Sequence, residues 1–247
     1  MASHSPLPSP PPLAELLEAG AVTLFLDFDG TLVGIAPRPG DIDVPLGLNR
    51  ALHSLRDRLE GRLALVSGRA LDDLEAHLGK VEIARAGSHG ASRFLADGER
   101  LGEAPNGLPR DAVAQLRDFA LSNNLFYETK SHGGALHFRG QPDKADQTRQ
   151  FARELALAHG LYVTSGKGVV ELVRPGANKG AALRAFMAIE PFIGSTPVFI
   201  GDDVTDEDGM RTAIEFSGFG IAVGERDSEA ASYHLQDVKA VHNWLNL

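Results

Sequence analysis

The feature that most constrains the fold is a run at residues 21–26 that is apolar except for one threonine and leads directly into Asp27. A continuous apolar run of this length is typical of a strand buried on both faces, as in a parallel sheet. A second such run covers 63–66. Between them, leucines recur at helical spacing over 48–59, and Gly61 follows where a helix would end. The segment therefore predicts a β-α-β unit.

The same alternation continues along the chain and returns near its end. A helix at 71–78 is expected to lead to a strand at 81–86. The late part of the chain predicts a helix at 179–189, a strand at 198–200, a helix at 208–215, a strand at 220–223 and a terminal helix ending near Trp244. The two ends of the chain together predict one doubly wound, mostly parallel, Rossmann-like α/β core.

The middle of the chain differs, because two-residue alternation replaces the continuous apolar runs. This pattern favours antiparallel strands with one covered face. We expect helices at 109–121 and 142–159, each followed by two strands, at 125–130, 134–139, 161–164 and 169–173. The order α-β-β-α-β-β predicts an inserted α+β domain. The expected organisation is a proline-rich disordered tail at 1–12, a core at 13–103 and 176–247, and an insert at 104–175.

Composition excludes several classes of function. The 247 residues include no cysteine, so a thiolate nucleophile and a cysteine zinc site are ruled out. Lys and Arg total 24 against 33 Asp and Glu, and the net charge of −9 argues against nucleic acid as a partner. No apolar run reaches the length of a membrane span, and the first residues lack a signal-peptide pattern. We expect a cytoplasmic protein, a monomer or weak oligomer, without a membrane partner.

Polar motifs follow the predicted strands, at the sheet edge where open α/β folds bind ligands. They are the segment from Asp27 through Asp29 to Thr31, the segment from Ser67 to Arg69, the pair Asn178 and Lys179, and the stretch 201–208 with its five acidic residues. Each alone has an ordinary explanation: a polar turn, a helix cap, a solvated lysine or an acid-rich helix start. Their convergence on one edge favours a ligand site.

The carboxylates at this edge point to a metal ion. So many acidic groups close together would repel one another strongly unless a cation lay among them. Oxygen ligands without cysteine favour a hard divalent cation, and a phosphate partner favours Mg²⁺ over Ca²⁺. The calcium-binding loop of an EF-hand does not occur in the chain. The sequence therefore predicts Mg²⁺ as the cofactor.

The four motifs, in this order, resemble those of the haloacid-dehalogenase-type (HAD) phosphohydrolases, with Asp27 and Asp29, Ser67, Lys179, and Asp202 and Asp203 at the matching positions. Within that superfamily the chain is similar to trehalose-6-phosphate phosphatases over 86–91, 128–130, 135–139, 171–176 and 201–207. The resemblance implies a HAD core with an inserted cap, or lid, at 104–175. It also implies Mg²⁺-dependent hydrolysis of trehalose 6-phosphate, a small sugar phosphate, to trehalose and phosphate.

The resemblance further implies a role for each core residue. Asp27 would be the nucleophile that forms an aspartyl-phosphate, and Asp29 the general acid/base. Lys179 would neutralise charge, while Thr31 and Ser67 would donate hydrogen bonds to phosphoryl oxygens. The side chains of Asp27 and Asp202 and the backbone carbonyl of Asp29 would bind the metal. Asp203 and Asp206 would orient Lys179 or a water on the metal.

Charged residues of the insert are the candidates for sugar binding. Spacing alone favours the solvated face of a half-buried sheet. The resemblance instead favours contact with a hydroxyl-rich disaccharide. The predicted substrate-binding residues are Glu128, Lys130, His132, Arg139, Glu171 and, at the edge of the core, Asn178.

Two alternatives remain open from the sequence. One is a HAD phosphatase for another sugar phosphate, such as sucrose 6-phosphate or a mannosyl phosphate, or a phosphomutase. The other is a phospho-accepting signalling domain of the receiver type, which also uses strand-end carboxylates, Mg²⁺ and a lysine. Asp29 argues against the receiver, because a long-lived phosphoryl switch should lack an acid/base.

Overall fold

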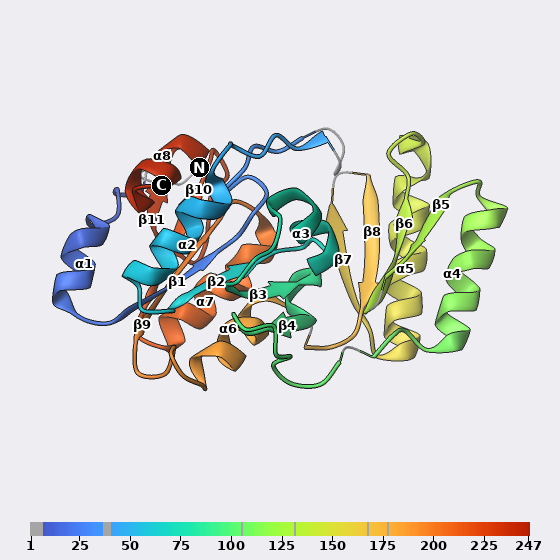
Figure 1. The fold of residues 1–247 in the computed structure, drawn as a ribbon. Coiled ribbons are helices and arrows are strands. Elements are labelled where there is room, and N and C mark those ends of the chain that lie inside the picture. The colour runs from blue at the N-terminus through green and yellow to red at the C-terminus, as the bar shows by residue number, and fades with distance from the viewer. Residues whose placement is uncertain (1–6, 37–40, 105, 131, 167, 177) are drawn as a thin grey trace. The chain divides into compact units, whose positions relative to one another are not determined.

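The computed structural model describes residues 7–36, 41–104, 106–130, 132–166, 168–176 and 178–247, and its fold is drawn in Figure 1. The chain divides into two compact units, one formed by Met1–Glu103 with Asn178–Leu247 and the other by Ala104–Ala177. None of the helices in these described ranges is long and apolar enough to cross a membrane.

The first unit is built on a seven-stranded sheet in the order β11-β10-β9-β1-β2-β3-β4. Neighbouring strands are parallel except for the antiparallel pair β3 and β4. The doubly wound, mostly parallel core predicted from the sequence is confirmed. The strands are β1 (Val22–Leu26), β2 (Leu63–Val66), β3 (Ala84–Gly87), β4 (Ser92–Phe94), β9 (Thr196–Gly201), β10 (Phe219–Val223) and β11 (Ala231–Leu235).

Helices cover both faces of this sheet, which is why the inner strands are apolar at nearly every position. All five residues of β1 are buried. One apolar cluster lies under α1, α2, α3 and α8, and a second lies under α6 and α7. The helices are α1 (Leu13–Ala19), α2 (Leu48–Arg58), α3 (Leu71–Leu78), α6 (Lys179–Met187), α7 (Glu207–Glu215) and α8 (Val238–Leu245), with short 3-10 turns at η2 (Ser88–Gly90) and η4 (Val204–Asp206).

The second unit is a four-stranded antiparallel sheet with the order β5-β6-β8-β7. Its elements are α4 (Arg110–Ser122), β5 (Phe126–Thr129), β6 (Gly133–His137), η3 (Pro142–Lys144), α5 (Ala145–His159), β7 (Tyr162–Gly166) and β8 (Val169–Val173), which is the predicted order α-β-β-α-β-β. Side chains such as Leu136, Val170 and Leu172 form its apolar core with α4 and α5. The opposite face carries charged side chains such as Glu128 and Glu171 together with apolar ones such as Phe126 and Val173.

Several local predictions were wrong or incomplete. The strand expected at 81–86 forms its ladder only over Ala84–Gly87, because Val81 and Ile83 are buried without pairing to a neighbouring strand. The short strands β4 and β11 and the first helix α1 were not predicted. Edge strands such as β11 carry polar side chains, so the apolar pattern that marks the central strands is absent there.

Half of the predicted disordered tail is ordered. The backbone carbonyl of Pro8 accepts a hydrogen bond from the His234 amide at 2.9 Å, and the Pro11 carbonyl accepts one from Trp244 Nε1 at 2.8 Å. Proline lacks an N–H but keeps its carbonyl, so a proline-rich segment can still cover the edge of a sheet as an acceptor. Residues 1–6 of the predicted tail lie outside the described residues.

Three phenylalanines form the centre of the cluster beneath α6. The rings of Phe186 and Phe192 have centroids 5.3 Å apart, and each lies about 6 Å from that of Phe25. Phe186→Ala should lower the free energy of unfolding by about 3–5 kcal/mol, because it removes a fully buried ring and leaves a cavity. Urea denaturation followed by the fluorescence of Trp244, the single tryptophan, measures this loss in the same unit.

The matched control is Leu46→Ala, since the Leu46 side chain is fully exposed. It should change the free energy of unfolding by no more than about 0.5 kcal/mol. A Phe186→Ala variant as stable as the Leu46→Ala variant would contradict the structural role given to the aromatic cluster.

Candidate active site

The candidate site lies where three adjacent parallel strands end. Because β1 pairs with β2 on one side and β9 on the other, the residues that follow them meet at one edge of the sheet. These residues are Asp27, Ser67 and Asp202. The Asp27 amide donates to the carbonyl of Ile200 at 2.9 Å, which extends the pairing of β1 and β9 up to the site.

Lys179 is the first residue of α6 and points into this edge. Its Nζ donates to Asp27 Oδ1 and to Asp206 Oδ1, each at 2.6 Å. The lysine side chain is only 2% exposed. Asn178 caps the same helix, because its Oδ1 accepts from the Ala181 amide at 2.7 Å. The cap fixes the start of α6 and therefore the position of Lys179.

Asp202 completes a compact acidic group. Asp27, Asp202 and Asp206 each offer a carboxylate oxygen, and these oxygens all lie within 4.8 Å of one another. The close approach of Asp202 requires glycine at position 30, where φ is +80° and a Cβ would lie 2.2 Å from Asp202 Oδ2. A side chain at position 30 would therefore displace Asp202.

The electrostatics of this group follow from burial and like charge. Burial and the nearby Asp206 carboxylate raise the pKa of Asp27 well above its usual value, against the opposing effect of Lys179. Burial and the carboxylates of Asp206 and Asp203 raise the pKa of Asp202 to about 6. Burial disfavours the charged form of Lys179, but Asp206 and Asp27 outweigh it, and the pKa of the lysine lies above its usual value.

These residues fit a divalent cation. Lys179 contacts Asp27 and Asp206 and brings one positive charge to a group of three carboxylates, so the group carries excess negative potential when it is fully ionised. Hard cations prefer oxygen ligands of this kind, and a bound cation would reduce the repulsion that raises the pKa values. Asp206 belongs to the group of possible ligands, although the sequence predicted it only as an orienting residue.

Two hydroxyls line the same edge. Thr31 is fully buried, and its Oγ1 has no hydrogen-bond partner among the described residues. A buried hydroxyl without a partner is costly, so this atom is suited to a ligand oxygen. Ser67 is also buried, and its Oγ accepts a hydrogen bond from the Arg69 amide at 3.1 Å.

The turn η2 holds the Ser67 loop in place, a contact that sequence analysis missed. The His89 amide donates to the Ser67 carbonyl at 3.0 Å, and the Ser88 amide donates to the Arg69 carbonyl at 2.6 Å. Both Ser88 and His89 have positive φ values of 55°, a backbone conformation that is uncommon outside glycine. The segment that carried part of the family resemblance therefore supports the Ser67 loop.

Arg69 is a second residue whose role was missed. Its guanidinium makes a bidentate ion pair with Asp29, with Nε and Nη2 each 2.7 Å from a carboxylate oxygen. Its Nη1 lies 2.6 Å from Asp73 on α3. The signal that could have identified Arg69 is its position two residues after Ser67. A cation there, at the end of a strand next to the one followed by Asp29, is suited to pair with that carboxylate. The pair fixes the orientation of Asp29.

The structure places the remaining predicted core residues, Asp206, Asp203 and Asp29, in different surroundings. Asp206 contacts Lys179 directly, and its role as an orienting residue stays a prediction. Asp203 is exposed, and its Oδ1 accepts from the Val204 amide in the cap of η4. The Asp29 carboxylate is not part of the acidic group, and the role of its backbone carbonyl as a metal ligand stays a prediction.

The second unit groups most of the predicted sugar-binding residues on one face. Strand register puts Glu128, Ala135, Glu171 and Thr164 in one row across the sheet, on the face opposite the helices. Lys130 Nζ donates to Glu171 Oε2 at 2.8 Å, and His132 Nε2 lies 3.2 Å from Glu171 Oε1. Small Ala135 separates the two glutamates of the row.

Two further residues of that unit lie near this group or beyond it. His137 Nε2 lies 2.8 Å from Glu128 Oε2 on the same face, a contact that was not predicted. Arg139 is exposed and lies past the end of β6, beside Gly168. Of the predicted set, Lys130 and His132 therefore lie against Glu171, Glu128 lies one strand further along the same row, Arg139 stands at the end of the hairpin, and Asn178 belongs to the first unit.

Comparisons with known proteins agree with this geometry. The family model for trehalose-phosphatase matches residues 25–239. The chain belongs to the trehalose-phosphatase family. The trehalose-6-phosphate phosphatase of Escherichia coli (strain K12) is 35% identical over 240 residues, which cover 96% of this chain and 90% of that protein. The predicted resemblance is confirmed.

Solved structures share the fold. The C-terminal domain of C. albicans trehalose-6-phosphate phosphatase superposes with a TM-score of 0.80 at 20% identity, covering 99% of this chain and 100% of that chain. A haloacid dehalogenase-like hydrolase from B. subtilis superposes with a TM-score of 0.67 at 15% identity, covering 92% and 99%. The family consists of phosphoric monoester hydrolases, which favours the predicted enzyme over the receiver-type alternative.

The raised pKa of Asp202 predicts how the metal-free protein responds to pH. In the unfolded chain an aspartate has a pKa of about 3.9, below the value of about 6 for Asp202 in the folded protein. Asp202 therefore contributes fully to the stability of the folded protein when the pH is below the unfolded pKa. This contribution is lost as the pH rises through about 6. In chelator, the melting temperature should therefore fall between about pH 4 and about pH 7, and an added divalent cation should raise it most at the higher pH.

Differential scanning fluorimetry across this pH range measures the effect. Asp202→Asn is the control, because an amide has no carboxyl to titrate and the metal-free variant should lose less stability as pH rises. Equal pH profiles for the two metal-free proteins would show that Asp202 is not the titrating group.

Proposed function

We propose that this chain is a Mg²⁺-dependent phosphatase that hydrolyses trehalose 6-phosphate to trehalose and phosphate through an aspartyl-phosphate on Asp27. The observation that carries the proposal is the buried contact of Lys179 Nζ with both Asp27 and Asp206, at 2.6 Å each, beside Asp202 at the end of β9. Family membership supports the phosphatase activity and the trehalose 6-phosphate substrate.

Asp27 is suited to attack on phosphorus. A carboxylate and a phosphate dianion repel each other, so the site must supply positive charge before they can approach. Lys179 provides a fixed ammonium next to the attacking carboxylate. A divalent cation held by the side chains of Asp27 and Asp202, with Asp206 beside them and the Asp29 carbonyl as a further proposed ligand, would supply additional positive charge.

The proposed chemistry proceeds in two steps at Asp27. In the first, a carboxylate oxygen of Asp27 bonds to phosphorus while the bond from phosphorus to the sugar oxygen breaks, and Asp29 gives that oxygen a proton. In the second, water attacks the acyl phosphate, Asp29 takes a proton from it, and Asp27 is released. Thr31 and Ser67 are proposed to donate hydrogen bonds to phosphoryl oxygens, and Arg69 orients Asp29.

Recognition of the sugar is proposed for the charged residues on the face of the second unit that lies opposite its helices. The row of Glu128 and Glu171, with Lys130 bound to Glu171, offers acceptors and donors that match the hydroxyl groups of a disaccharide. His132 and Arg139 are further candidates, and so is the amide nitrogen of Asn178. Phosphatases for other sugar phosphates would share the core residues and differ in these groups.

A phosphate-release panel tests the substrate and the metal together. Trehalose 6-phosphate should be hydrolysed with a kcat/KM at least about tenfold above glucose 6-phosphate and sucrose 6-phosphate, because only the matched sugar satisfies the polar groups of the second unit. Chelation should abolish release, and added Mg²⁺ should restore it. Glu171→Gln should reduce this preference while leaving hydrolysis of p-nitrophenyl phosphate nearly unchanged. Equal kcat/KM values for the three sugar phosphates would contradict the assignment of trehalose 6-phosphate as the substrate.

The proposed roles of Asp27 and Asp29 can be distinguished by the kinetics of their variants with p-nitrophenyl phosphate. Nitrophenolate leaves without protonation, so Asp29→Asn should still release about one equivalent of nitrophenol per enzyme before turnover slows. The same variant should lose about 10²- to 10⁴-fold in kcat on the sugar phosphate. Asp27→Asn should show no burst and no turnover. A burst from Asp27→Asn, or near-native turnover by either variant, would overturn the assigned roles.

A further inference from the structure

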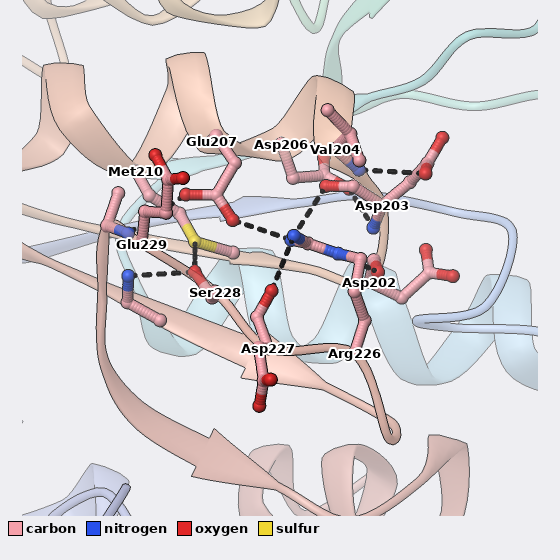
Figure 2. Close-up of polar contacts among 12 residues, drawn as sticks. Asp202, Asp203, Val204, Asp206, Glu207, Met210, Arg226, Asp227, Ser228 and Glu229 are labelled. Carbon is pink, nitrogen blue, oxygen red and sulfur yellow. Dashed lines mark hydrogen bonds and ion pairs between the residues drawn. The ribbon is translucent and has the colours of Figure 1, made fainter. Parts of the chain in front are cut away.

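Arg226, in the loop after β10, places its positively charged side chain against the acidic loop after β9. Arg226 donates from Nε to the carbonyl of Asp202 and from Nη2 to the carbonyl of Asp203, both at 3.1 Å, as Figure 2 shows. Its Nη2 also lies 2.6 Å from Glu207 Oε1. One guanidinium therefore joins two consecutive backbone carbonyls to a carboxylate on the first turn of α7.

Glu207 is the fixed end of this arrangement. The residue is 5% exposed, and its second oxygen accepts a hydrogen bond from the Ala230 amide at 2.9 Å. Burial alone would raise the pKa of Glu207, but its bonds with Arg226, Ser228 and Ala230 outweigh burial and lower it. Glu207 therefore binds Arg226 and is not part of the acidic group around Lys179.

The geometry points to Arg226 as a positioning residue for the metal-binding carboxylate of Asp202, and we propose that it sets the affinity of the site for Mg²⁺. Asp202 must hold its side chain against Gly30 and close to two other carboxylates, which repel it. Bonds to the carbonyls of Asp202 and Asp203 fix the backbone from which that side chain projects. The inference rests on the proposed binding of a divalent cation at Asp202.

The shape of the guanidinium explains why arginine is needed. Its planar fork donates in several directions at once and can reach two carbonyls and a carboxylate together. A lysine ammonium at the same position is a single point and cannot reproduce the three contacts. Partners that orient metal ligands typically change metal affinity by about 10- to 100-fold when they are removed.

The test is Mg²⁺ binding to the purified full chain, measured by isothermal titration calorimetry and by the Mg²⁺-dependent rise in melting temperature. Arg226→Gln should raise the Kd for Mg²⁺ at least about tenfold, and Arg226→Lys should recover only part of the loss. In phosphate-release assays, the Mg²⁺ concentration for half-maximal rate should rise in parallel. Saturating Mg²⁺ should restore most of the wild-type rate.

Arg211→Gln is the matched control. Arg211 lies on α7 at 4.0 Å from Glu207 Oε2 and 3.0 Å from Glu229 Oε2, and within the described part of the chain it does not contact the carbonyls of Asp202 or Asp203. The control removes the same positive charge near the same glutamate, so its Kd should stay within about twofold of wild type. An equal loss in both variants would mean that net charge, rather than the fork of Arg226, sets the affinity, and would overturn the proposal.

Other outcomes are equally decisive. Wild-type affinity in both Arg226 variants would overturn the positioning role while leaving the proposed phosphatase intact. Absence of Mg²⁺ binding by the wild type would overturn both. If Arg226→Gln does not fold, Glu207→Gln, which keeps the arginine but removes the charge that holds it, provides the second variant, and its Kd should also rise. An unchanged Kd in a folded Glu207→Gln protein would contradict the inference.

Discussion

The site depends on one buried ammonium between two buried carboxylates. Removing Lys179, Asp27 and Asp206 from water has a large desolvation cost, and only close contacts such as the two at 2.6 Å offset it. Removing one partner would leave an uncompensated buried charge. The arrangement joins the ends of β1 and η4 to the start of α6, three segments far apart in the chain. A buried ion pair often contributes little to the stability of a fold. The position of this pair at the edge where open α/β sheets bind ligands therefore favours a chemical role.

The acidic stretch after β9 illustrates how one run of charges is divided among tasks. Asp202 and Asp206 face Asp27 and Lys179, and Glu207 faces Arg226. Asp203 caps η4. Neighbouring carboxylates such as Asp206 and Glu207 point to different sides of a helical turn, so a high local density of charge does not mean that all of it serves one ligand.

Much of the fold was predictable because its central strands are buried on both faces. The bounds predicted at 63–66, 71–78 and 169–173 coincide with β2, α3 and β8. Prediction failed at the edges, where β4 and β11 are short and partly exposed, and in the tail, where Pro8 and Pro11 act as acceptors. In these places pairing depends on partners distant in the chain rather than on local periodicity.

The sequence by itself determined that Asp27, Ser67 and Asp202 meet, because each follows a buried parallel strand and adjacent parallel strands end at the same edge. It also indicated that Lys179 opens a helix near that edge. Only the tertiary structure decided which side chains pair: Asp206 rather than Asp203 with Lys179, Arg69 with Asp29, and Arg226 with the carbonyls after β9. Such pairs depend on the direction of each side chain and on loops brought together by folding, and residue spacing along the chain encodes neither.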